Sequence, residues 1–537
     1  MIKRLLSNQT HTITGAALIL GAASFLSRLI GILRDRIFAH YFGAGDTLDA
    51  YFAAFRVPDL VYNLVIVGAL SAGFIPVFMK LLVKNKDEAW RLTNTIINIF
   101  GLALLGLCAV LFILTPQLMR YITPGFDGEK LKTTILLTRI MFASPILLGL
   151  SSIISGVLQS FKSFLIYSLT PIAYNVGIIL GAIFLVPLFG VKGLAFGVIL
   201  GALLHLAIQI PTLLQHGFRY RPTFEWRDAN VREIARLSIP RTLGLAASQL
   251  NFLVITIIGS TLAAGSLAIF NFANNLQYFP IGIIGYSFAI AAFPTLSQLV
   301  AEKNGDAFTS HLSKTIRQIL FFIIPLTLVF LLLRAQIVRV VLGSGQFSWD
   351  ATIATANALA FFSLSLFAQC LIPLLARAFF ALADTWTPFV IGFVSALINI
   401  IFALLLKDQY GVVGLAIAFS IAMVVQLALL WIALRKRTFT LHELPILHTL
   451  YKLSIAALLM GVTIQILKAP IAAVVDMTRF WGIATQGLVA GGSGLLVYSF
   501  VSLALRVEEM RELRVSLKRR WLKLTNVPGE VREAEEI

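Results

Sequence analysis

The sequence predicts an all-α polytopic membrane protein, and three observations carry the prediction. Of its 537 residues, 58% are hydrophobic and 13% are charged, which is roughly half the charged share of a soluble domain. The apolar residues gather into runs long enough to cross a bilayer as helices. The order of these runs repeats in the second half of the chain. This composition excludes an ordinary soluble domain.

A membrane-spanning helix needs about 20 apolar residues, and a window of that length finds about fourteen candidate spans. They cover residues 13–42, 48–79, 92–115, 133–158, 164–188, 191–214, 235–262, 267–299, 315–342, 351–376, 387–407, 411–433, 449–467 and 481–505. The first run lacks a short apolar core followed by a small-residue cleavage site. We therefore expect it to be a span and not a cleavable signal peptide.

The formal net charge of +18 reflects basic residues that lie mostly between the apolar runs. Basic loops of this kind set the topology of a membrane protein, so a nucleic-acid partner is not expected. If the N-terminus is inside, fifteen basic residues fall in cytoplasmic loops and six in the opposite loops. The positive-inside rule therefore predicts that both termini are cytoplasmic.

An internal duplication explains the repeated order of the runs. A shift of 219 residues aligns Leu48 with Leu267 and Lys84-Asn85 with Lys303-Asn304, and shifts of 217 and 221 align later elements. Six spans followed by six related spans start on the same side of the membrane. The sequence thus predicts two parallel six-helix repeats related by an axis along the membrane normal, an arrangement typical of transporters that rock around a central site.

The repeat divides the chain into four predicted parts. Residues 1–226 form an N-terminal six-helix lobe, 227–440 a C-terminal six-helix lobe, 441–506 two extra C-terminal helices, and 507–537 a charged cytoplasmic tail. Basic residues surround Trp521 in the tail. They favour either a surface-lying helix near anionic lipid headgroups or a solvated tail.

Charged residues inside the first two spans are the candidate binding residues. Arg28 and Asp35 lie on one helical face of the first span, with Arg34 beside it, and Asp49 and Arg56 share a face at the start of the second span. Charges within a membrane normally face a cavity or one another. A cavity with several arginines would favour an anion, and the planar arginine fork suits phosphate oxygens. The alternative is that several of these side chains lie at the interface and extend into water.

The sequence shows no catalytic, metal-binding or cofactor-binding pattern. Cys108 and Cys370 each lie inside an apolar run, and the seven histidines are scattered without metal-ligand spacing. No Walker loop is present. We expect a transporter that is not an enzyme, has no metal or other cofactor, and does not hydrolyse ATP.

Against this background the chain resembles the MurJ (MviN) family of lipid II flippases, within the multidrug/oligosaccharidyl-lipid/polysaccharide exporter superfamily. The most specific motif is Ser27-Arg28-x-x-Gly31-x-x-Arg34-Asp35, and further matches are Phe42-Gly43-Ala44-Gly45, Asp49-Ala50, Phe55-Arg56-x-Pro58, Gly68-Ala69-Leu70-Ser71, Phe74-Ile75-Pro76, Phe293-Pro294-x-Leu296-Ser297 and Arg377-Ala378-Phe379-Phe380-Ala381. The resemblance covers nearly the whole chain.

The resemblance implies fourteen spans, two six-helix lobes around a cationic cavity, and a groove for the polyprenyl tail formed by the two extra helices. It implies that the protein carries lipid II from the inner to the outer leaflet of the bacterial cytoplasmic membrane by alternating access, in peptidoglycan and cell-wall biogenesis. Arg28, Arg34, Asp35 and Asp49 match positions the family is thought to need, with the arginines facing pyrophosphate. Membrane lipids and cell-wall synthesis proteins are the other implied partners.

The sequence departs from the family pattern at three positions. Tyr62 and Asn275 stand where many members carry arginine, and Val67 stands where many carry glutamate. We expect Asn275 to contribute hydrogen bonds to the substrate where those members contribute a charge. The departures leave open a flippase for another polyprenyl-linked glycan or a drug or cation antiporter of the same superfamily. A non-transporting scaffold for cell-wall synthases is the alternative from a different class.

Overall fold

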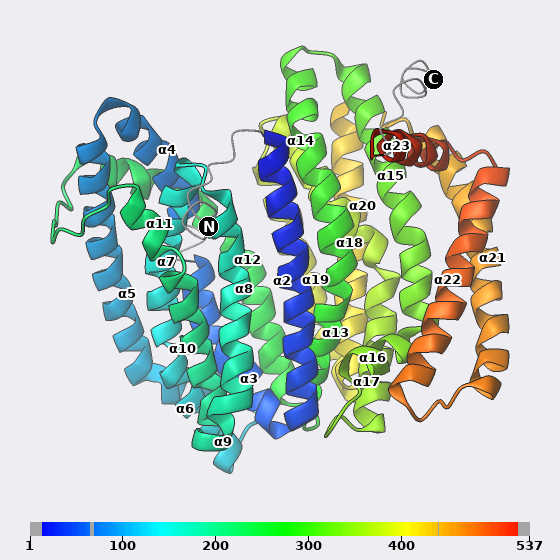
Figure 1. The fold of residues 1–537 in the computed structure, drawn as a ribbon, viewed down its shortest axis with the longest axis horizontal. Coiled ribbons are helices and arrows are strands. Elements are labelled where there is room, and N and C mark those ends of the chain that lie inside the picture. The colour runs from blue at the N-terminus through cyan, green and yellow to red at the C-terminus, as the bar shows by residue number, and fades with distance from the viewer. Residues whose placement is uncertain (1–12, 65–68, 439, 525–537) are drawn as a thin grey trace. The chain divides into compact units, whose positions relative to one another are not determined.

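The computed structural model describes residues 13–64, 69–438 and 440–524, and these residues are helical with no β-strand among them. The helices of the first half are α2 (Ile13–Phe42), α3 (Asp46–Val61), α4 (Ala69–Lys84), α5 (Lys86–Ile122), α6 (Gly128–Met141), α7 (Ala143–Ser160), α8 (Phe164–Leu180), the π-helix η2 (Gly181–Leu185), α9 (Val186–Phe189), α10 (Lys192–Ala207) and α11 (Ile210–Gln215). Figure 1 shows α5, α7, α8 and α10 running alongside one another.

The second half continues the all-helical architecture. Its helices are α12 (Ala229–Ser260), α13 (Ser266–Pro280), the π-helix η3 (Ile281–Gly285), α14 (Tyr286–Ala301), α15 (Gly305–Leu332), α16 (Arg334–Leu342), α17 (Trp349–Leu364), α18 (Leu366–Ala381), α19 (Trp386–Tyr410), α20 (Val412–Thr438), α21 (Glu443–Val474), α22 (Phe480–Ala504) and α23 (Glu508–Leu524). The prediction of an all-α polytopic membrane protein is confirmed.

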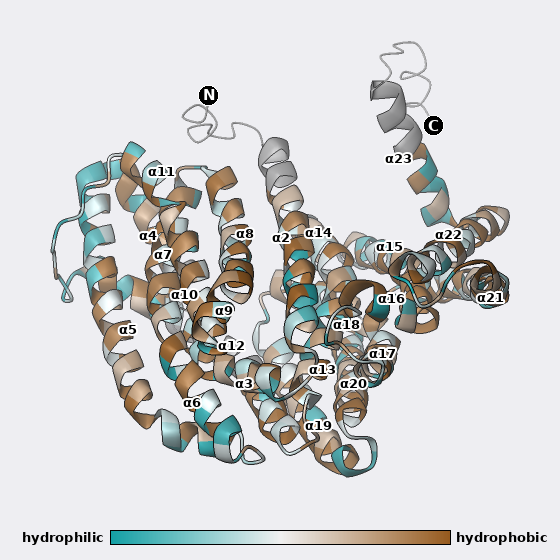
Figure 2. Ribbon diagram, turned by 60° about the horizontal axis from the view of Figure 1, so that its bottom comes forward, coloured by the Kyte–Doolittle hydropathy of each residue, from teal (hydrophilic) through white to brown (hydrophobic). Residues whose placement is uncertain are grey.

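The predicted spans coincide with single helices or with consecutive helices. Within the described residues, ten helical segments are long and apolar enough to cross a membrane, and the bent pair α17 and α18 would make an eleventh. The count of fourteen is consistent with these segments and stays a prediction. Apolar residues run along the helices, as Figure 2 shows by colour.

Contacts divide the chain into two compact units. The first comprises the described residues up to Phe272, with Val341–Ala354 and Asn399–Leu415. The second comprises Ala273–Val340, Thr355–Ile398 and the described residues from Ala416 onward. The predicted lobe boundaries at residues 226, 440 and 506 follow the sequence repeat and stay a prediction.

The backbone carries traces of the duplication. A π-helical turn begins at Tyr62 in the second span, and the π-helix η3 begins at Ile281, which is the same place after a shift of 219. Asn85 caps the N-terminus of α5 and Asn304 caps that of α15, each by accepting a backbone N–H with its side chain. These irregular features recur at the spacing of the sequence repeat, which supports the duplication.

Helices α8 and α10 in the first unit pack through glycines. Gly177 of α8 and Gly181, the first residue of η2, lie against Gly197 and Gly201 of α10. A Cβ added to Gly197 would lie 2.8 Å from the Cα of Gly181. Small residues let two membrane helices bring their backbones together. Helix α8 also packs on α2, so this glycine seam fixes the helix that lies beside the charged part of α2.

The two extra helices belong to the second unit. Helices α21 and α22 pack on one another and α21 packs on α15. Tyr498 of α22 donates a hydrogen bond to the carbonyl oxygen of Phe321 over 2.8 Å, and Gln336 donates to Gln486 over 2.7 Å. Polar contacts therefore join α22 to the core of this unit at two levels.

The described part of the charged tail is helix α23, which is held on α15. Arg317 forms ion pairs with Glu508 at 2.7 Å and with Glu509 at 2.8 Å. Lys314 pairs with Glu512. The acidic side of α23 is thus bound to protein, whereas its approach to lipid headgroups stays a prediction.

Candidate functional site

Arg34 and Asp35 of α2 form an ion pair in the first unit. The Nη2 and Nε atoms of Arg34 lie 2.8 and 3.0 Å from Oδ1 of Asp35. Its Nη1 donates to Oδ1 of Asn175, on α8, over 3.1 Å. Asp35 is buried, whereas 23% of the Arg34 side chain is exposed. The guanidinium is therefore oriented by two neighbours and still reaches an accessible surface.

Arg28 lies on the same helix as Arg34 and is half-buried. Six residues separate the two arginines, which corresponds to about 9 Å along the axis. The predicted cluster of Arg28, Arg34 and Asp35 thus occupies two turns of α2.

Asp49 of α3 is buried, and its carboxylate binds the start of α13. Oδ2 accepts the backbone N–H of Gly265 over 2.7 Å, and Oδ1 accepts that of Ala268 over 3.0 Å. Lys130 lies 3.0 Å from Oδ2 and also pairs with Asp46 at 2.6 Å. A carboxylate at a helix N-terminus satisfies free N–H groups and favours the helix dipole. Asp49 therefore joins α3 to α13 in this structure.

Arg56 makes a second link between α3 and α13. Its Nη2 donates to Oδ1 of Asn271 over 3.0 Å, and the guanidinium lies 5.7 Å from the Phe252 ring. Its Nε is buried and has no hydrogen-bond partner among the described residues. A buried donor of this kind is available to a ligand or a water.

Asn275 lies on α13, one turn after Asn271, and is half-buried. It belongs to the second compact unit. Near it in sequence, Gln277 donates to Asn274 over 3.0 Å and accepts from Gln369 over 2.8 Å. Gln369 also donates to Ser365 over 3.0 Å. The second unit therefore contains a chain of uncharged polar groups. Asn274, Asn275 and Gln277 are candidate donors from the sequence, whereas it gave no indication of Gln369 and Ser365.

The loop after α2 is packed against residues 343–348. The backbone N–H of Gln346 donates to the carbonyl oxygen of His40 over 2.9 Å. Gly43 has φ +61°, and a Cβ there would lie 2.6 Å from the carbonyl oxygen of Gln346. Arg36 donates to the carbonyl oxygen of Val341 over 3.2 Å. The first glycine of the Phe-Gly-Ala-Gly motif is thus required by both its backbone angle and a close approach.

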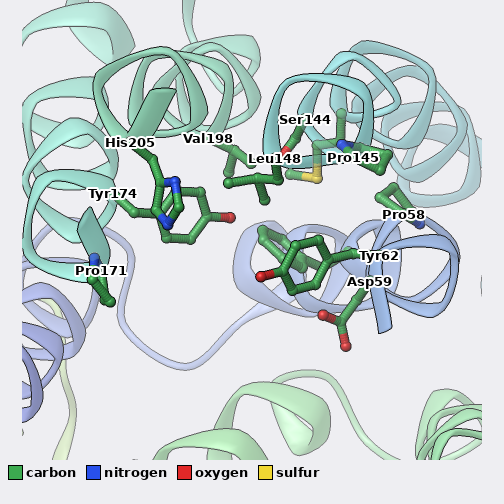
Figure 3. Close-up of a pocket in the computed structure, with 12 residues that line it drawn as sticks. Pro58, Asp59, Tyr62, Ser144, Pro145, Leu148, Pro171, Tyr174, Val198 and His205 are labelled. Carbon is green, nitrogen blue, oxygen red and sulfur yellow. The ribbon is translucent and has the colours of Figure 1, made fainter. Parts of the chain in front are cut away.

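The first unit contains a cavity of about 250 Å³ (Figure 3). Its lining includes Asp59 from α3, Tyr62 from the π-turn that follows α3, Tyr174 from α8 and His205 from α10. The hydroxyl groups of Tyr62 and Tyr174 turn toward one another across the opening. His205 is hydrogen-bonded to Ser151 over 2.6 Å. Sequence reasoning noted Tyr62 only as a missing arginine and did not single out Asp59 or Tyr174.

Asp59 is the carboxylate among the residues that line this cavity, and its Oδ1 accepts a hydrogen bond from Asn63 over 2.9 Å. Among the described residues, no group of three or more His, Cys, Asp or Glu could hold a metal ion. The arrangement suits binding of a polar ligand by arginine, tyrosine and carboxylate groups.

Comparison with protein families decides the relationship. The family model described as lipid II flippase MurJ matches residues 38–483. The chain belongs to the lipid II flippase MurJ family. Members of this family are transporters and not enzymes. The probable lipid II flippase MurJ of Vibrio cholerae is 29% identical over 78% of this chain and 82% of its own length. That of Thermotoga maritima is 29% identical over 91% and 96%, respectively.

Solved structures agree with the MurJ assignment. The lipid II flippase MurJ in an inward closed conformation matches with a TM-score of 0.75 and 25% identity, covering 91% of this chain and 99% of that one. An inward-facing multidrug resistance MATE transporter of the MOP superfamily matches with a TM-score of 0.66 and 17% identity over 78% and 96%. The second likeness shows a shared fold alone.

Proposed function

We propose that this MurJ family member is a lipid II flippase that moves the undecaprenyl-pyrophosphate-linked peptidoglycan precursor from the inner to the outer leaflet of the bacterial cytoplasmic membrane. Curated relatives that align with most of this chain are named lipid II flippase MurJ or probable lipid II flippase MurJ. The transport class follows from the family. The leaflet direction, the cytoplasmic position of both termini and the roles of individual residues are parts of the proposal.

The observation that carries the binding role is the contact set of Arg34. A pyrophosphate is an anion, and ionised donors make the strong hydrogen bonds to phosphate oxygens. Three of the five N–H donors of Arg34 are used by Asp35 and Asn175. Two are left for a ligand, and the side chain is partly exposed. In the proposal, Asp35 orients Arg34, and Arg28 binds the same anion from the preceding turns.

Asp49 and Arg56 have a different proposed role. Both oxygens of Asp49 receive hydrogen bonds from protein, which supports a role in holding α13 in place over direct binding of the substrate. Arg56 contacts Asn271, and its unpaired Nε offers a donor. We expect movement of α13 during the transport cycle to break the bonds of Asp49.

Asn275 is proposed to donate a neutral hydrogen bond to the substrate. Such a bond contributes about 0.5–1.5 kcal/mol, against about 1.5–3 kcal/mol for a bond to a charged group. Capture of the pyrophosphate would then depend mainly on the arginines of the first half of the chain.

A depletion-rescue experiment tests the function. The resident lipid II flippase of a bacterium is depleted, this protein is expressed, and lipid II accessible on the outer membrane face is measured. We expect rescue by the natural chain and by Lys132→Gln, which removes an exposed charge, and loss of rescue with Arg34→Ala at equal membrane abundance. Rescue by Arg34→Ala would contradict the proposed binding site.

Two further outcomes separate the alternatives. Well-inserted protein without rescue would favour a flippase for another polyprenyl-linked glycan. A scaffold would support growth without moving lipid II in vesicles that contain only this protein. Transport of lipid II in such vesicles would exclude the scaffold.

A further inference from the structure

The loop that joins α11 to α12, residues 217–228, is bound across the side of α5. We call it the strap. Asn94 of α5 donates to the carbonyl oxygen of Arg219 over 3.0 Å and accepts the N–H of Arg221 over 3.1 Å. Asn98 donates to the carbonyl oxygen of Thr223 over 2.8 Å. These bonds are made to the backbone, so they fix the path of the strap. The hydroxyl of Tyr220 also donates to Oδ1 of Asn98 over 2.8 Å, so Tyr220 is held on α5 as well.

The exposed side chains of the strap are basic and aromatic. Tyr220, Phe224 and Trp226 are 61%, 54% and 57% exposed. Three arginines are exposed beside them, namely Arg219, Arg221 and Arg227. The Arg227 guanidinium lies 4.6 Å from the Trp226 ring. Large aromatic side chains at this exposure mark an interaction surface.

The acidic residues of the strap are already paired. Glu225 accepts from Nε of Arg91 over 2.7 Å. Asp228 caps α12 by accepting the N–H of Asn230 over 2.7 Å. The exposed surface of the strap is therefore cationic, which fits an anionic partner.

The attachment to α5 sets the level of the strap in the membrane. Beyond Asn98, α5 presents exposed apolar side chains that include Leu102, Leu105, Val110 and Ile113, between 54% and 70% exposed. On a membrane-spanning helix these face lipid chains. Leu102 follows Asn98 by four residues, or about 6 Å. The strap therefore lies at the boundary between headgroups and acyl chains, and Figure 2 shows hydrophilic residues at this end of α5.

We propose that the strap is a binding surface for the headgroups of anionic phospholipids. At this level the aromatic rings insert among the glycerol and upper chain groups, as tyrosine and tryptophan do at membrane interfaces. The arginines bind the phosphates, and basic residues near an anionic leaflet each contribute about 1 kcal/mol, or about fivefold. This inference does not depend on which lipid-linked substrate the protein transports.

The test uses the full-length protein in phosphatidylcholine vesicles that contain phosphatidylglycerol brominated on its acyl chains. Bromine quenches nearby tryptophan fluorescence. The signal of Trp226 is the difference between the natural chain and Trp226→Phe. We expect quenching of Trp226 to be about fivefold stronger with brominated phosphatidylglycerol than with brominated phosphatidylcholine at the same low mole fraction.

Two variants locate the preference. The triple change Arg219→Gln, Arg221→Gln and Arg227→Gln should abolish it without disturbing the backbone bonds. The pair Asn94→Ala and Asn98→Ala should weaken it while leaving all three arginines in place. The matched control is the triple change Arg120→Gln, Lys132→Gln and Lys192→Gln, which removes exposed charge from the opposite ends of helices in the same unit. The control should keep the preference.

Three results would overturn the proposal. Trp226 unquenched by either lipid would place the strap away from the bilayer and leave an acidic protein as its partner. Equal quenching by both lipids would show contact without headgroup binding. Loss of the preference in the control triple as well would show a general effect of net charge.

Discussion

Helices α3 and α13 hold equivalent places in the two repeats but differ in chemistry. Arg56 of α3 aligns with Asn275 of α13, and Asp49 aligns with Ala268, at the same shift of 219. Helices α13 and α14 contain no Asp, Glu, Lys or Arg. The π-turns and the asparagine caps are shared, whereas the charges occur in the first copy. These backbone features were therefore kept in both copies after duplication, while the charged side chains were not.

One of the bonds between the two copies joins a pair of equivalent positions. Oδ1 of Asp49 accepts the backbone N–H of Ala268, its own counterpart in the repeat, over 3.0 Å. A backbone donor makes this contact whatever side chain stands at position 268. The second copy therefore keeps its half of the contact without a charged residue.

The largest expected effect comes from substitutions at the equivalent positions Arg56 and Asn275. Arg56→Asn removes the bond to Asn271 and a charged donor, so we expect lipid II transport in vesicles to fall about tenfold or more. Asn275→Ala removes a neutral group and should reduce transport by less than about fivefold. Equal losses would show that charge in the first copy has no special importance.

Asp49→Ala should have the next largest effect, on stability. It leaves the N–H groups of Gly265 and Ala268 unpaired and takes one partner from Lys130. We expect the free energy of unfolding to fall by about 2–3 kcal/mol, seen as a lower thermal midpoint in detergent. Asp127→Ala is the control, because Asp127 precedes α6 without a side-chain capping bond. A similar loss in both variants would argue against the cap.

The asparagine caps should have smaller and matching effects. Asn85→Ala and Asn304→Ala each remove a side-chain acceptor at a helix start. Each should lower the free energy of unfolding by about 1 kcal/mol. The measurement is again the thermal midpoint, with the double variant as a check on additivity. A marked difference between the midpoint shifts of Asn85→Ala and Asn304→Ala would mean that the two caps do not stabilise their helices equally.

The smallest expected effect is a pH dependence at His216, in the first copy. Burial first, and then the charge of Lys86, lower the pKa of His216, which stacks on Phe161 at 4.2 Å and hydrogen-bonds to Ser163. The unfolded chain then binds more protons than the folded one just below the usual histidine pKa of about 6.5. The free energy of unfolding should therefore fall, by less than about 1 kcal/mol, as the pH drops through that value.

A matched variant checks this dependence. His216→Gln should flatten the profile of thermal midpoint against pH between about 5 and 7. At a shift of 221, the second copy has Arg437, which does not titrate in this range. A profile unchanged by His216→Gln would assign the dependence to another group.

Much of the fold could be predicted from the sequence, because the apolar runs and the repeat are both visible in the order of residue types. The ion pair of Arg34 and Asp35 was also predictable, since isolated charges inside a span are costly and neighbouring opposite charges pair with one another. The contacts of Asp49 could not be predicted in this way. Its partners are backbone N–H groups more than two hundred residues away, and such donors have no signature in sequence.

Sequence reasoning also missed two other features, the cavity that Asp59 lines and the defined path of the strap. The cavity is lined by four different spans, so no stretch of sequence displays it. The basic loop was correctly noted, but its interpretation stopped at topology. Only the bonds from Asn94 and Asn98 show that the loop has a defined path.

The glycine seam between α8 and α10 limits how this protein can evolve. Asn175, which helps to orient Arg34, lies two residues before Gly177 on α8. A single methyl group added at Gly177 would meet the backbone of Gly201 and push α8 aside. Mutational tolerance in the first unit is therefore expected to be low at these glycines, where the close approach of two backbones leaves no room for a side chain.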